Sequence, residues 1–157
     1  IVSCEYQEIK NLCDYNHKQR YLVYNGNQWG VFNDGKLIIP NIYEDINIVS
    51  QDDHNVAGYY PLGEMYIARI NGLYGLVDSS NNTLIPFEYQ SINLVEESEY
   101  PVRYFIVQSH FLLGAYDSKF NKICECQYHN IKFNEDWWAP MLLANVNNRE
   151  YRYKRFQ

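Results

Sequence analysis

Two groups of cysteine and histidine have the residue types that bind zinc. Cys124, Cys126 and His129 lie close together, and Cys13 precedes His17 by four positions. Structural zinc sites usually contain closely spaced ligand pairs such as Cys-x-x-Cys, and neither group has such a pair. A free cysteine otherwise behaves as a small buried hydrophobic side chain. We therefore expect the cysteines to fill the core and predict no metal and no cofactor, with metal binding and redox chemistry as the alternatives.

The histidines and two aspartates are the other residues with potentially catalytic side chains. The four histidines stand in polar, turn-like contexts, at His17, His54, His110 and His129. A general base needs a positioned partner, and the sequence has no Gly-x-Ser-x-Gly nucleophile motif. Asp78 and Asp117 occupy the same place in a repeat as Asn33, which can form a turn but cannot act as an acid. The sequence therefore predicts a protein that is not an enzyme.

The elements that would position these residues are repeated along the chain. The pattern Tyr-x-x-Ile occurs four times, at Tyr6/Ile9, Tyr43/Ile46, Tyr89/Ile92 and Tyr128/Ile131. Upstream of three of these tyrosines a large side chain precedes a glycine, in Trp29-Gly30, Tyr74-Gly75 and Leu113-Gly114. Asn25-Gly26, Asp34-Gly35 and Asn71-Gly72 are typical of tight hairpin turns, because these residue types tolerate positive φ. The repeated unit thus consists of short strands separated by turns.

No segment has the periodicity of a long helix, so the sequence predicts an all-β fold of tandem, stacked β-meanders. Strands are expected around Val23, Val31, Ile38, Ile46, Ile67, Leu76, Ile85, Ile92, Phe105, Ile123 and Ile131. We expect one β-repeat domain over residues 1–157, divided into a partial repeat 1–20, repeats 21–58, 59–99 and 100–136, and a degraded partial repeat 137–157. The alternative is a closed, propeller-like ring of four units, in which the two terminal half-units pair.

These motifs together resemble the bacterial WG repeat. The resemblance covers about residues 21–133 and is strongest at Trp29-Gly30-Val31-Phe32-Asn33 and Tyr74-Gly75-Leu76-Val77-Asp78. The third unit departs from the pattern, with Leu113 in place of the aromatic residue and Cys124-Glu125-Cys126 in place of Ile-Pro. The resemblance implies a β-rich repeat module that binds a partner rather than catalysing a reaction.

The aromatic residues that precede the repeated glycines have two possible roles. A recurring aromatic residue in a repeat protein usually packs each unit against the next, so we expect Trp29 and Tyr74 to be buried like Ile46, Ile92 and Ile131. The alternative is a platform on which sugar rings stack, which would make the protein a carbohydrate-binding or cell-envelope-binding module.

Acidic and aromatic residues follow each Tyr-x-x-Ile and form the predicted binding site. In a stacked array, equivalent loops line one face, so these acids would form a stripe edged by aromatic anchors. An acidic loop can also be a solvated surface without a partner. The predicted binding residues are Asp52, Asp53, Tyr60, Glu96, Glu97, Glu99, Tyr100, Glu135, Asp136, Trp137 and Trp138.

Composition limits the remaining function classes. The net charge is −6, so the phosphate backbone of a nucleic acid would be repelled. The sequence has no apolar stretch long enough to span a membrane, and its four cysteines are too sparse for a disulfide framework. We expect a cytoplasmic protein, although a chain that starts at Ile1 leaves room for a removed signal. The favoured function is binding of a basic protein partner, for example a toxin neutralised by an immunity protein.

Overall fold

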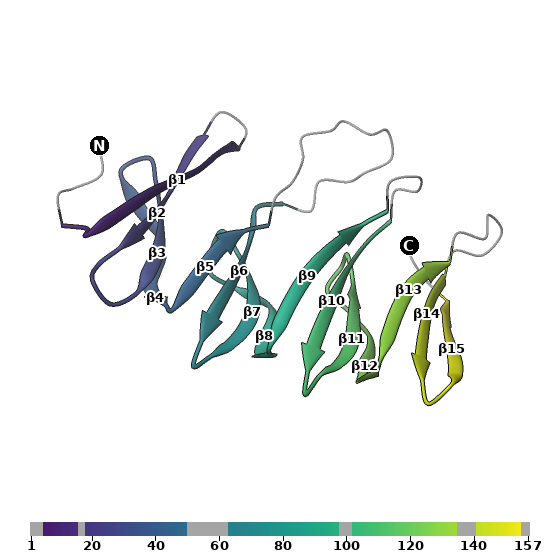
Figure 1. The fold of residues 1–157 in the computed structure, drawn as a ribbon. Helices are drawn as coiled ribbons and strands as arrows, with labels where there is room; N and C mark the ends of the chain where they lie inside the picture. Colours follow the sequence, from purple (N-terminus) through teal and green to yellow (C-terminus); the bar gives the residue numbers. More distant parts are fainter. Residues whose placement is uncertain (1–4, 16–17, 50–62, 98–101, 135–140, 155–157) are drawn as a thin grey trace. The chain divides into compact units, whose positions relative to one another are not determined.

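The computed structural model describes residues 5–15, 18–49, 63–97, 102–134 and 141–154. These residues form fifteen β-strands and no helix, which confirms the all-β prediction (Figure 1). Every strand centre predicted from the sequence lies inside a strand. The described residues form two compact units, the first ending at Glu88 and the second beginning at Tyr89. None of these residues belongs to a helix that could cross a membrane.

The first unit contains two four-stranded antiparallel meanders, each with its strands in chain order. One comprises β1 (Glu8–Tyr15), β2 (Lys18–Tyr24), β3 (Trp29–Asn33) and β4 (Lys36–Tyr43). The other comprises β5 (Asp45–Ile48), β6 (Met65–Ile70), β7 (Leu73–Asp78) and β8 (Thr83–Tyr89). One buried cluster joins them, with Leu22, Val31, Ile39 and Tyr43 from the first sheet and Ile46, Tyr66, Ala68 and Val77 from the second. The core of this unit therefore lies between two stacked meanders.

The second unit repeats this arrangement with one strand fewer. Its first sheet comprises β9 (Ser91–Glu96), β10 (Arg103–Ser109), β11 (Leu112–Asp117) and β12 (Lys122–Tyr128). Its second sheet comprises β13 (Asn130–Asn134), β14 (Met141–Val146) and β15 (Arg149–Lys154). The shared core contains Tyr104, Ala115, Cys124 and Tyr128 from the first and Leu142 and Ala144 from the second.

The four sheets share one register, which confirms the four-fold Tyr-x-x-Ile pattern as a structural repeat. Each isoleucine stands on the first strand of its sheet, opposite a small or β-branched residue of the second strand: Ile9 opposite Val23, Ile46 opposite Ala68, Ile92 opposite Val107 and Ile131 opposite Ala144. The residue after each tyrosine donates its backbone N–H to the second strand in the same way, from Gln7 to Tyr24, Glu44 to Arg69, Gln90 to Gln108 and His129 to Asn145. Residues of different sheets can therefore be compared position by position.

The repeated glycines allow the fourth strand of a sheet to cross close to the third. A Cβ on Gly30 would lie 2.6 Å from the backbone oxygen of Ile39, and a Cβ on Gly114 would lie 2.9 Å from that of Cys124. At both places the pairing of the third and fourth strands shifts register, as in a β-bulge. In the last sheet Tyr151 stands opposite Ala144, where the other sheets have glycine. The described part of that sheet has three strands and no fourth.

Three of the four Tyr-x-x-Ile motifs, those of Tyr43, Tyr89 and Tyr128, form the connection between two sheets. In each, the tyrosine ends the fourth strand of one sheet and the isoleucine lies in the first strand of the next. Tyr43, Tyr89 and Tyr128 are at most 4% exposed. Their hydroxyls are satisfied by partners within the same unit: Asn81 Oδ1 for Tyr43, the Tyr116 hydroxyl for Tyr89 and the Tyr153 hydroxyl for Tyr128. A buried tyrosine needs such a partner, so Tyr43 links the two sheets of the first unit, and Tyr128 links the two sheets of the second.

Three predicted core positions are wrong, because Trp29, Tyr74 and Ile131 are only partly buried. Ile46 and Ile92 are buried, as predicted. Each of the two aromatic residues lies at or next to the beginning of a third strand, whose central residues face the core. Trp29 and Tyr74 thus differ from the tyrosine of Tyr-x-x-Ile, which is buried at Tyr43, Tyr89 and Tyr128.

The ring alternative required the two terminal half-units to pair. Among the described strands, β1 pairs with β2 of its own sheet, and β13, β14 and β15 form a separate sheet. The strand pairing that would complete a fourth ring unit is thus not found in the described part of the chain, and each sheet is an open meander. The proposed division into partial and complete repeats stays a prediction.

Candidate functional site

Ten of the eleven predicted binding residues lie in the connectors between the first and second strands of the last three sheets, and Glu96 is the last residue of β9. In sequence, these connectors include residues 50–62, 98–101 and 135–140, and in each antiparallel pair the end of the first strand lies beside the start of the second, at one end of the sheet. We call this the connector end. Nine of the predicted residues lie outside the described residues: Asp52, Asp53, Tyr60, Glu99, Tyr100, Glu135, Asp136, Trp137 and Trp138.

Glu96 and Glu97 are the two predicted binding residues that the structure describes, and both have partners inside the protein. Glu96 stands directly opposite Arg103, and its Oε1 lies 3.0 Å from the Arg103 Nε. Glu97 accepts a 2.9 Å hydrogen bond from the Tyr104 hydroxyl. Burial of Tyr104 and this carboxylate raise the pKa of the phenol above its ordinary value. These two acids therefore link the end of β9 to the start of β10.

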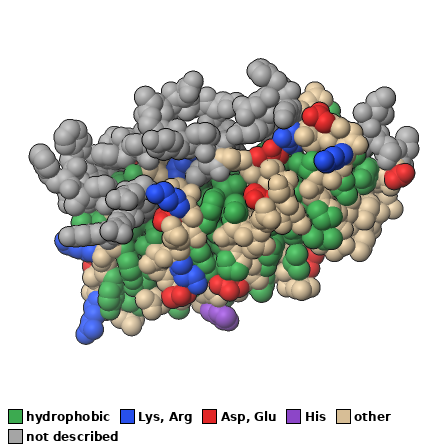
Figure 2. All heavy atoms as spheres, turned by 180° about the vertical axis from the view of Figure 1, so that it is seen from behind, with side chains coloured by type: hydrophobic (Ala, Val, Ile, Leu, Met, Phe, Trp, Pro, Cys, Tyr) green, Lys and Arg blue, Asp and Glu red, His purple; other side chains and the backbone are tan. Residues whose placement is uncertain are grey.

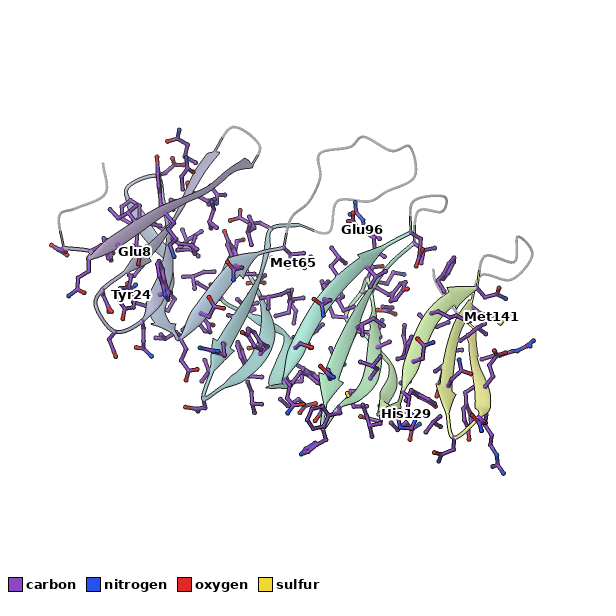
Figure 3. The ribbon with its side chains drawn as sticks, viewed as in Figure 1. Glu8, Tyr24, Met65, Glu96, His129 and Met141 are labelled. Carbon is purple, nitrogen blue, oxygen red and sulfur yellow. The ribbon has the colours of Figure 1, made fainter. Side chains whose placement is uncertain are left out.

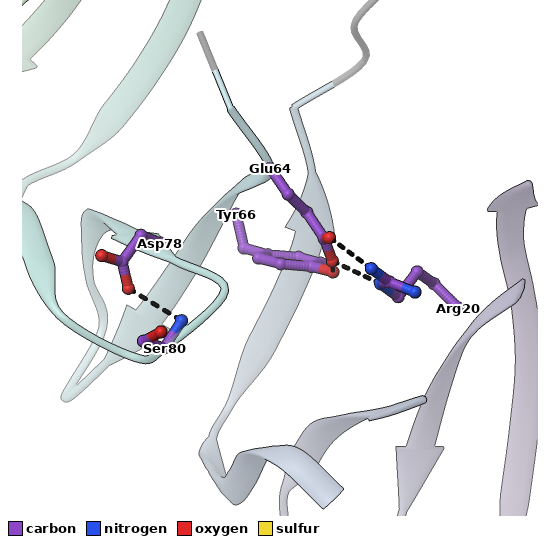
Figure 4. Close-up of polar contacts among 5 residues, drawn as sticks. All are labelled: Arg20, Glu64, Tyr66, Asp78 and Ser80. Atoms are coloured by element: carbon purple, nitrogen blue, oxygen red, sulfur yellow. Dashed lines mark hydrogen bonds and ion pairs between the residues drawn. The ribbon is translucent and has the colours of Figure 1, made fainter. Parts of the chain in front are cut away.

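The first unit has a more deeply buried cluster at its connector end, which the sequence did not reveal. Arg20 on β2 donates two 2.6 Å hydrogen bonds to the two carboxylate oxygens of Glu64, just before β6 (Figure 4). The Tyr66 hydroxyl donates to the same carboxylate. The Arg20 and Glu64 side chains are only 6% and 7% exposed, and burial raises the pKa of Tyr66 well above its ordinary value. Such a bidentate pair fixes two sheets in one geometry.

The opposite end of each sheet, where the second and third strands turn, differs between the units. We call this the hairpin end. In the β5–β8 sheet the turn is Asn71-Gly72, and the Glu44 carboxylate accepts a 3.1 Å hydrogen bond from the Gly72 N–H and lies 3.1 Å from the Arg69 Nε. In the β9–β12 sheet the turn is His110-Phe111, and the Phe111 side chain is 85% exposed. Figure 3 shows Glu96 at the connector end and His129 at the opposite end of the second unit.

Asp78 and Asp117 form turns, as predicted. The Asp78 carboxylate accepts hydrogen bonds from the backbone N–H groups of Ser80 and Asn82, and Asp117 bonds Lys119 and Asn121 in the same way. Burial opposes ionisation of Asp78, but the bonds from Asn82 and Ser80 outweigh it and hold its pKa below the ordinary value. Both carboxylates therefore accept hydrogen bonds from the backbone of their own turns.

The described cysteines and histidines do not belong to a group of side chains that could hold a metal ion. Cys124 is 6% exposed within the core and is a free thiol, and burial raises its pKa to about 11. His110 and His129 are exposed, and the His110 ring nitrogen Nδ1 lies 3.0 Å from the Ser109 hydroxyl. Among the described residues no three potential ligands are grouped closely enough to hold a metal ion. The side chains of Cys4, Cys13, His17 and His54 lie outside the described residues.

Part of the chain matches a known repeat family. The WG-containing repeat family matches residues 74–103, which run from Tyr74-Gly75 through β7, β8 and β9 to Arg103. The chain carries a WG repeat. A comparison with curated proteins and a comparison with solved structures each found no match.

The aromatic residues of the WG motif are partly covered by neighbouring side chains. The Lys10 Nζ lies 4.5 Å from the centroid of the Trp29 ring, and the Tyr24 ring centroid lies 5.0 Å from that of Trp29. The Arg69 guanidinium carbon lies 5.7 Å from the Tyr74 ring centroid. Cation–π contacts of this kind occupy a ring face, which leaves less of each ring for a sugar than the platform alternative supposed.

Charge of one sign is not concentrated on the face that Figure 2 shows. Figure 2 shows Asp and Glu side chains scattered singly over the visible face, several of them beside a Lys or Arg. Ion pairs among the described residues include Glu44–Arg69, Glu96–Arg103 and Lys122–Glu125. The acidic connectors could be predicted from the sequence, but the exposed turn at Phe111 could not, because it lacks the Asn-Gly pair typical of tight hairpin turns.

Proposed function

We propose that the chain is a non-enzymatic protein-binding module whose acidic connectors dock a basic protein partner. The observation that carries this proposal is the distribution of charge along the sequence. Residues 50–62, 98–101 and 135–140 contain no Lys or Arg and five acids: Asp52, Asp53, Glu99, Glu135 and Asp136. These segments therefore supply −5 of the formal net charge of −6.

The topology of the sheets supports the same proposal. Each acidic segment joins the first strand of a sheet to the second, so equivalent positions of the repeat carry the charge. Repeat proteins commonly vary such loops to build a binding face. Negative charge at equivalent loops would steer a basic partner and raise its association rate. The nearby Tyr60, Tyr100, Trp137 and Trp138 are residue types that anchor protein interfaces.

Several features favour binding over catalysis. The Cys124 thiol has a pKa of about 11, so almost none of it is the nucleophilic thiolate at neutral pH. Asp78 and Asp117 accept hydrogen bonds from their own turns. The exposed Ser109–His110 pair forms no bond to a carboxylate among the described residues that would orient the imidazole. A basic toxin, neutralised by an immunity protein, is one partner with the required chemistry.

The test is capture of a partner at two salt concentrations by two variants with the same net charge. In the connector variant, Asp52, Asp53 and Asp136 become Asn, and Glu99 and Glu135 become Gln. In the matched control, five exposed acids outside the connectors become amides: Glu5, Glu8, Asp34, Glu125 and Glu150. We expect the wild type and the control to bind the same basic protein at low salt, with less bound at high salt, and the connector variant to lose it. Equal loss in both variants would contradict a site at the connectors.

A further inference from the structure

The His110-Phe111 turn has a backbone conformation that its residues disfavour. Both residues have positive φ, 50° and 66°, as a two-residue type I′ turn requires. The equivalent turns elsewhere use Asn71-Gly72 and Asn147-Asn148, with φ of 51° and 76° and of 50° and 59°. Asparagine and glycine adopt this conformation at little cost, whereas a bulky aromatic residue rarely does. The β9–β12 sheet therefore has a less favourable turn than its neighbours.

The folded chain gains no burial from Phe111 to offset that cost. Its side chain is 85% exposed, whereas the other exposed large hydrophobic residues among those described are 36–44% exposed. Exposure of a phenyl ring forgoes the free energy that burial would provide. A strained and exposed aromatic residue at a loop tip is the kind of outlier from which a binding role can be inferred.

The positions around Phe111 have also lost their charges relative to the β5–β8 sheet. By the shared register, Glu44, Asp45, Arg69 and Glu88 correspond to Gln90, Ser91, Gln108 and Gln127. The hairpin end of the β9–β12 sheet thus has an exposed phenyl ring on its turn, and amide or hydroxyl side chains at four positions where the β5–β8 sheet has Arg, Asp or Glu. Depletion of charge around an aromatic residue is the composition of an interface core, because charged groups are costly to desolvate.

We propose that Phe111 is an anchor that inserts into an apolar pocket of a protein partner, with the uncharged hairpin end of the β9–β12 sheet as the surrounding contact. Small ligands, including sugars, bind in concave sites, whereas Phe111 stands on a projecting turn, so the pocket belongs to the partner. The rim of that pocket would offer uncharged hydrogen-bonding groups to His110 and Gln108. The proposal deepens the proposed function, because it rests on the chain binding protein and adds a second surface.

This anchor is distinct from the acidic connectors. β10 runs for seven residues from the connector end to the hairpin end, which separates the two by roughly 20 Å at ~3.3 Å per residue. A contact made by an uncharged surface depends little on ionic strength, whereas the connector contact is screened by salt. The two surfaces can therefore be tested separately in the same full-length chain.

The first test exchanges the turns. His110→Asn with Phe111→Gly places the turn of the β5–β8 sheet in the β9–β12 sheet, and we expect the midpoint of urea unfolding to rise. The reciprocal change, Asn71→His with Gly72→Phe, is the matched control and should lower it. A lower midpoint for the first variant would show that Phe111 serves the fold, and it would overturn the proposal.

The second test places photoreactive benzoylphenylalanine at position 111 of the full chain, and at position 72 as the control, in a lysate of the source organism at high salt. We expect one protein to be crosslinked from position 111 and none from position 72. The His110→Asn/Phe111→Gly variant should bind that protein at least tenfold more weakly. The connector variant should still bind it at high salt. Binding unchanged by the turn exchange, a crosslink only to a second copy of the chain, or turn-dependent binding only to glycans on an array would each overturn the proposal. Loss of salt dependence in the connector variant bears on the proposed function alone.

Discussion

The β5–β8 sheet and the β9–β12 sheet have the same strand arrangement, but the side chains at their hairpin ends differ. Both place an isoleucine of Tyr-x-x-Ile opposite a small or β-branched residue on the second strand, and both need a glycine beneath the crossing fourth strand. At the hairpin end, however, the first has an Asn-Gly turn beside the Glu44–Arg69 pair, and the second has Phe111 among amides. Since the strand arrangement is the same, the two repeats differ mainly in the side chains that they expose at the hairpin end.

The two sheets also differ at the connector end, where the largest effect is expected. Glu64→Gln removes the charge that balances the buried Arg20 guanidinium and should destabilise the protein by about 3–5 kcal/mol, as for other broken buried ion pairs. Glu97→Gln in the second unit keeps an acceptor for Tyr104 and should cost less than about 1.5 kcal/mol. Urea unfolding of both variants measures the contrast. Equal losses would show that the two connector ends are built alike.

Removal of the shared core residue should affect both sheets in the same way. Ile46 is 1% exposed and Ile92 is 5% exposed, so Ile46→Ala and Ile92→Ala should each cost about 2–5 kcal/mol. Denaturant unfolding of the two variants tests the common scaffold. A loss within about 0.5 kcal/mol at either site, as at an exposed position, would break the equivalence of the two sheets.

Substitution of the repeated glycine by alanine should lower the stability by a smaller amount. A Cβ at Gly114 would lie 2.9 Å from the backbone of Cys124 and Cys126, whereas a Cβ at Gly75 would meet the ring of Phe87 at 2.7 Å. Gly114→Ala should cost about 1–3 kcal/mol, since a backbone cannot move aside without disturbing the strand. Gly75→Ala should cost less if the Phe87 ring can rotate. Thermal unfolding of the two variants measures both losses of stability. A Gly114→Ala variant as stable as the wild type would exclude a close crossing of the third and fourth strands.

Cys124 provides the mildest test, because it fills a core position of the third repeat. Burial raises its thiol pKa from 9.0 to about 11, so its contribution to stability is fully present below pH 9 and is lost as the pH rises through about 11. Iodoacetamide at pH 8 should modify Cys126 faster than Cys124 in the folded protein and both equally in urea. Mass spectrometry of the labelled peptides measures the two rates, and rapid labelling of Cys124 in the folded state would contradict its core position.

The sequence was sufficient for the elements governed by periodicity and turn chemistry. The four Tyr-x-x-Ile motifs, the aspartate turns and the core cysteine at position 124 follow from local patterns that the structure confirms. Burial of Trp29 and Tyr74 was predicted wrongly, because their exposure depends on where the third strand begins relative to the core. The Arg20–Glu64 pair joins residues far apart in sequence, and no local pattern could reveal it. Phe111 was missed because it replaces the turn residues that mark such a site.

The central claim is that charge at the connectors steers a protein partner while aromatic residues hold it. The most direct measurement is the association and dissociation rates of the captured partner on the immobilised full chain between low and high salt. We predict that association slows as salt rises, that neutralising Asp52, Asp53, Glu99, Glu135 and Asp136 removes most of this dependence, and that Trp137→Ala or Trp138→Ala mainly speeds dissociation. Association rates that are independent of salt and unchanged by the five neutralising substitutions would contradict the account.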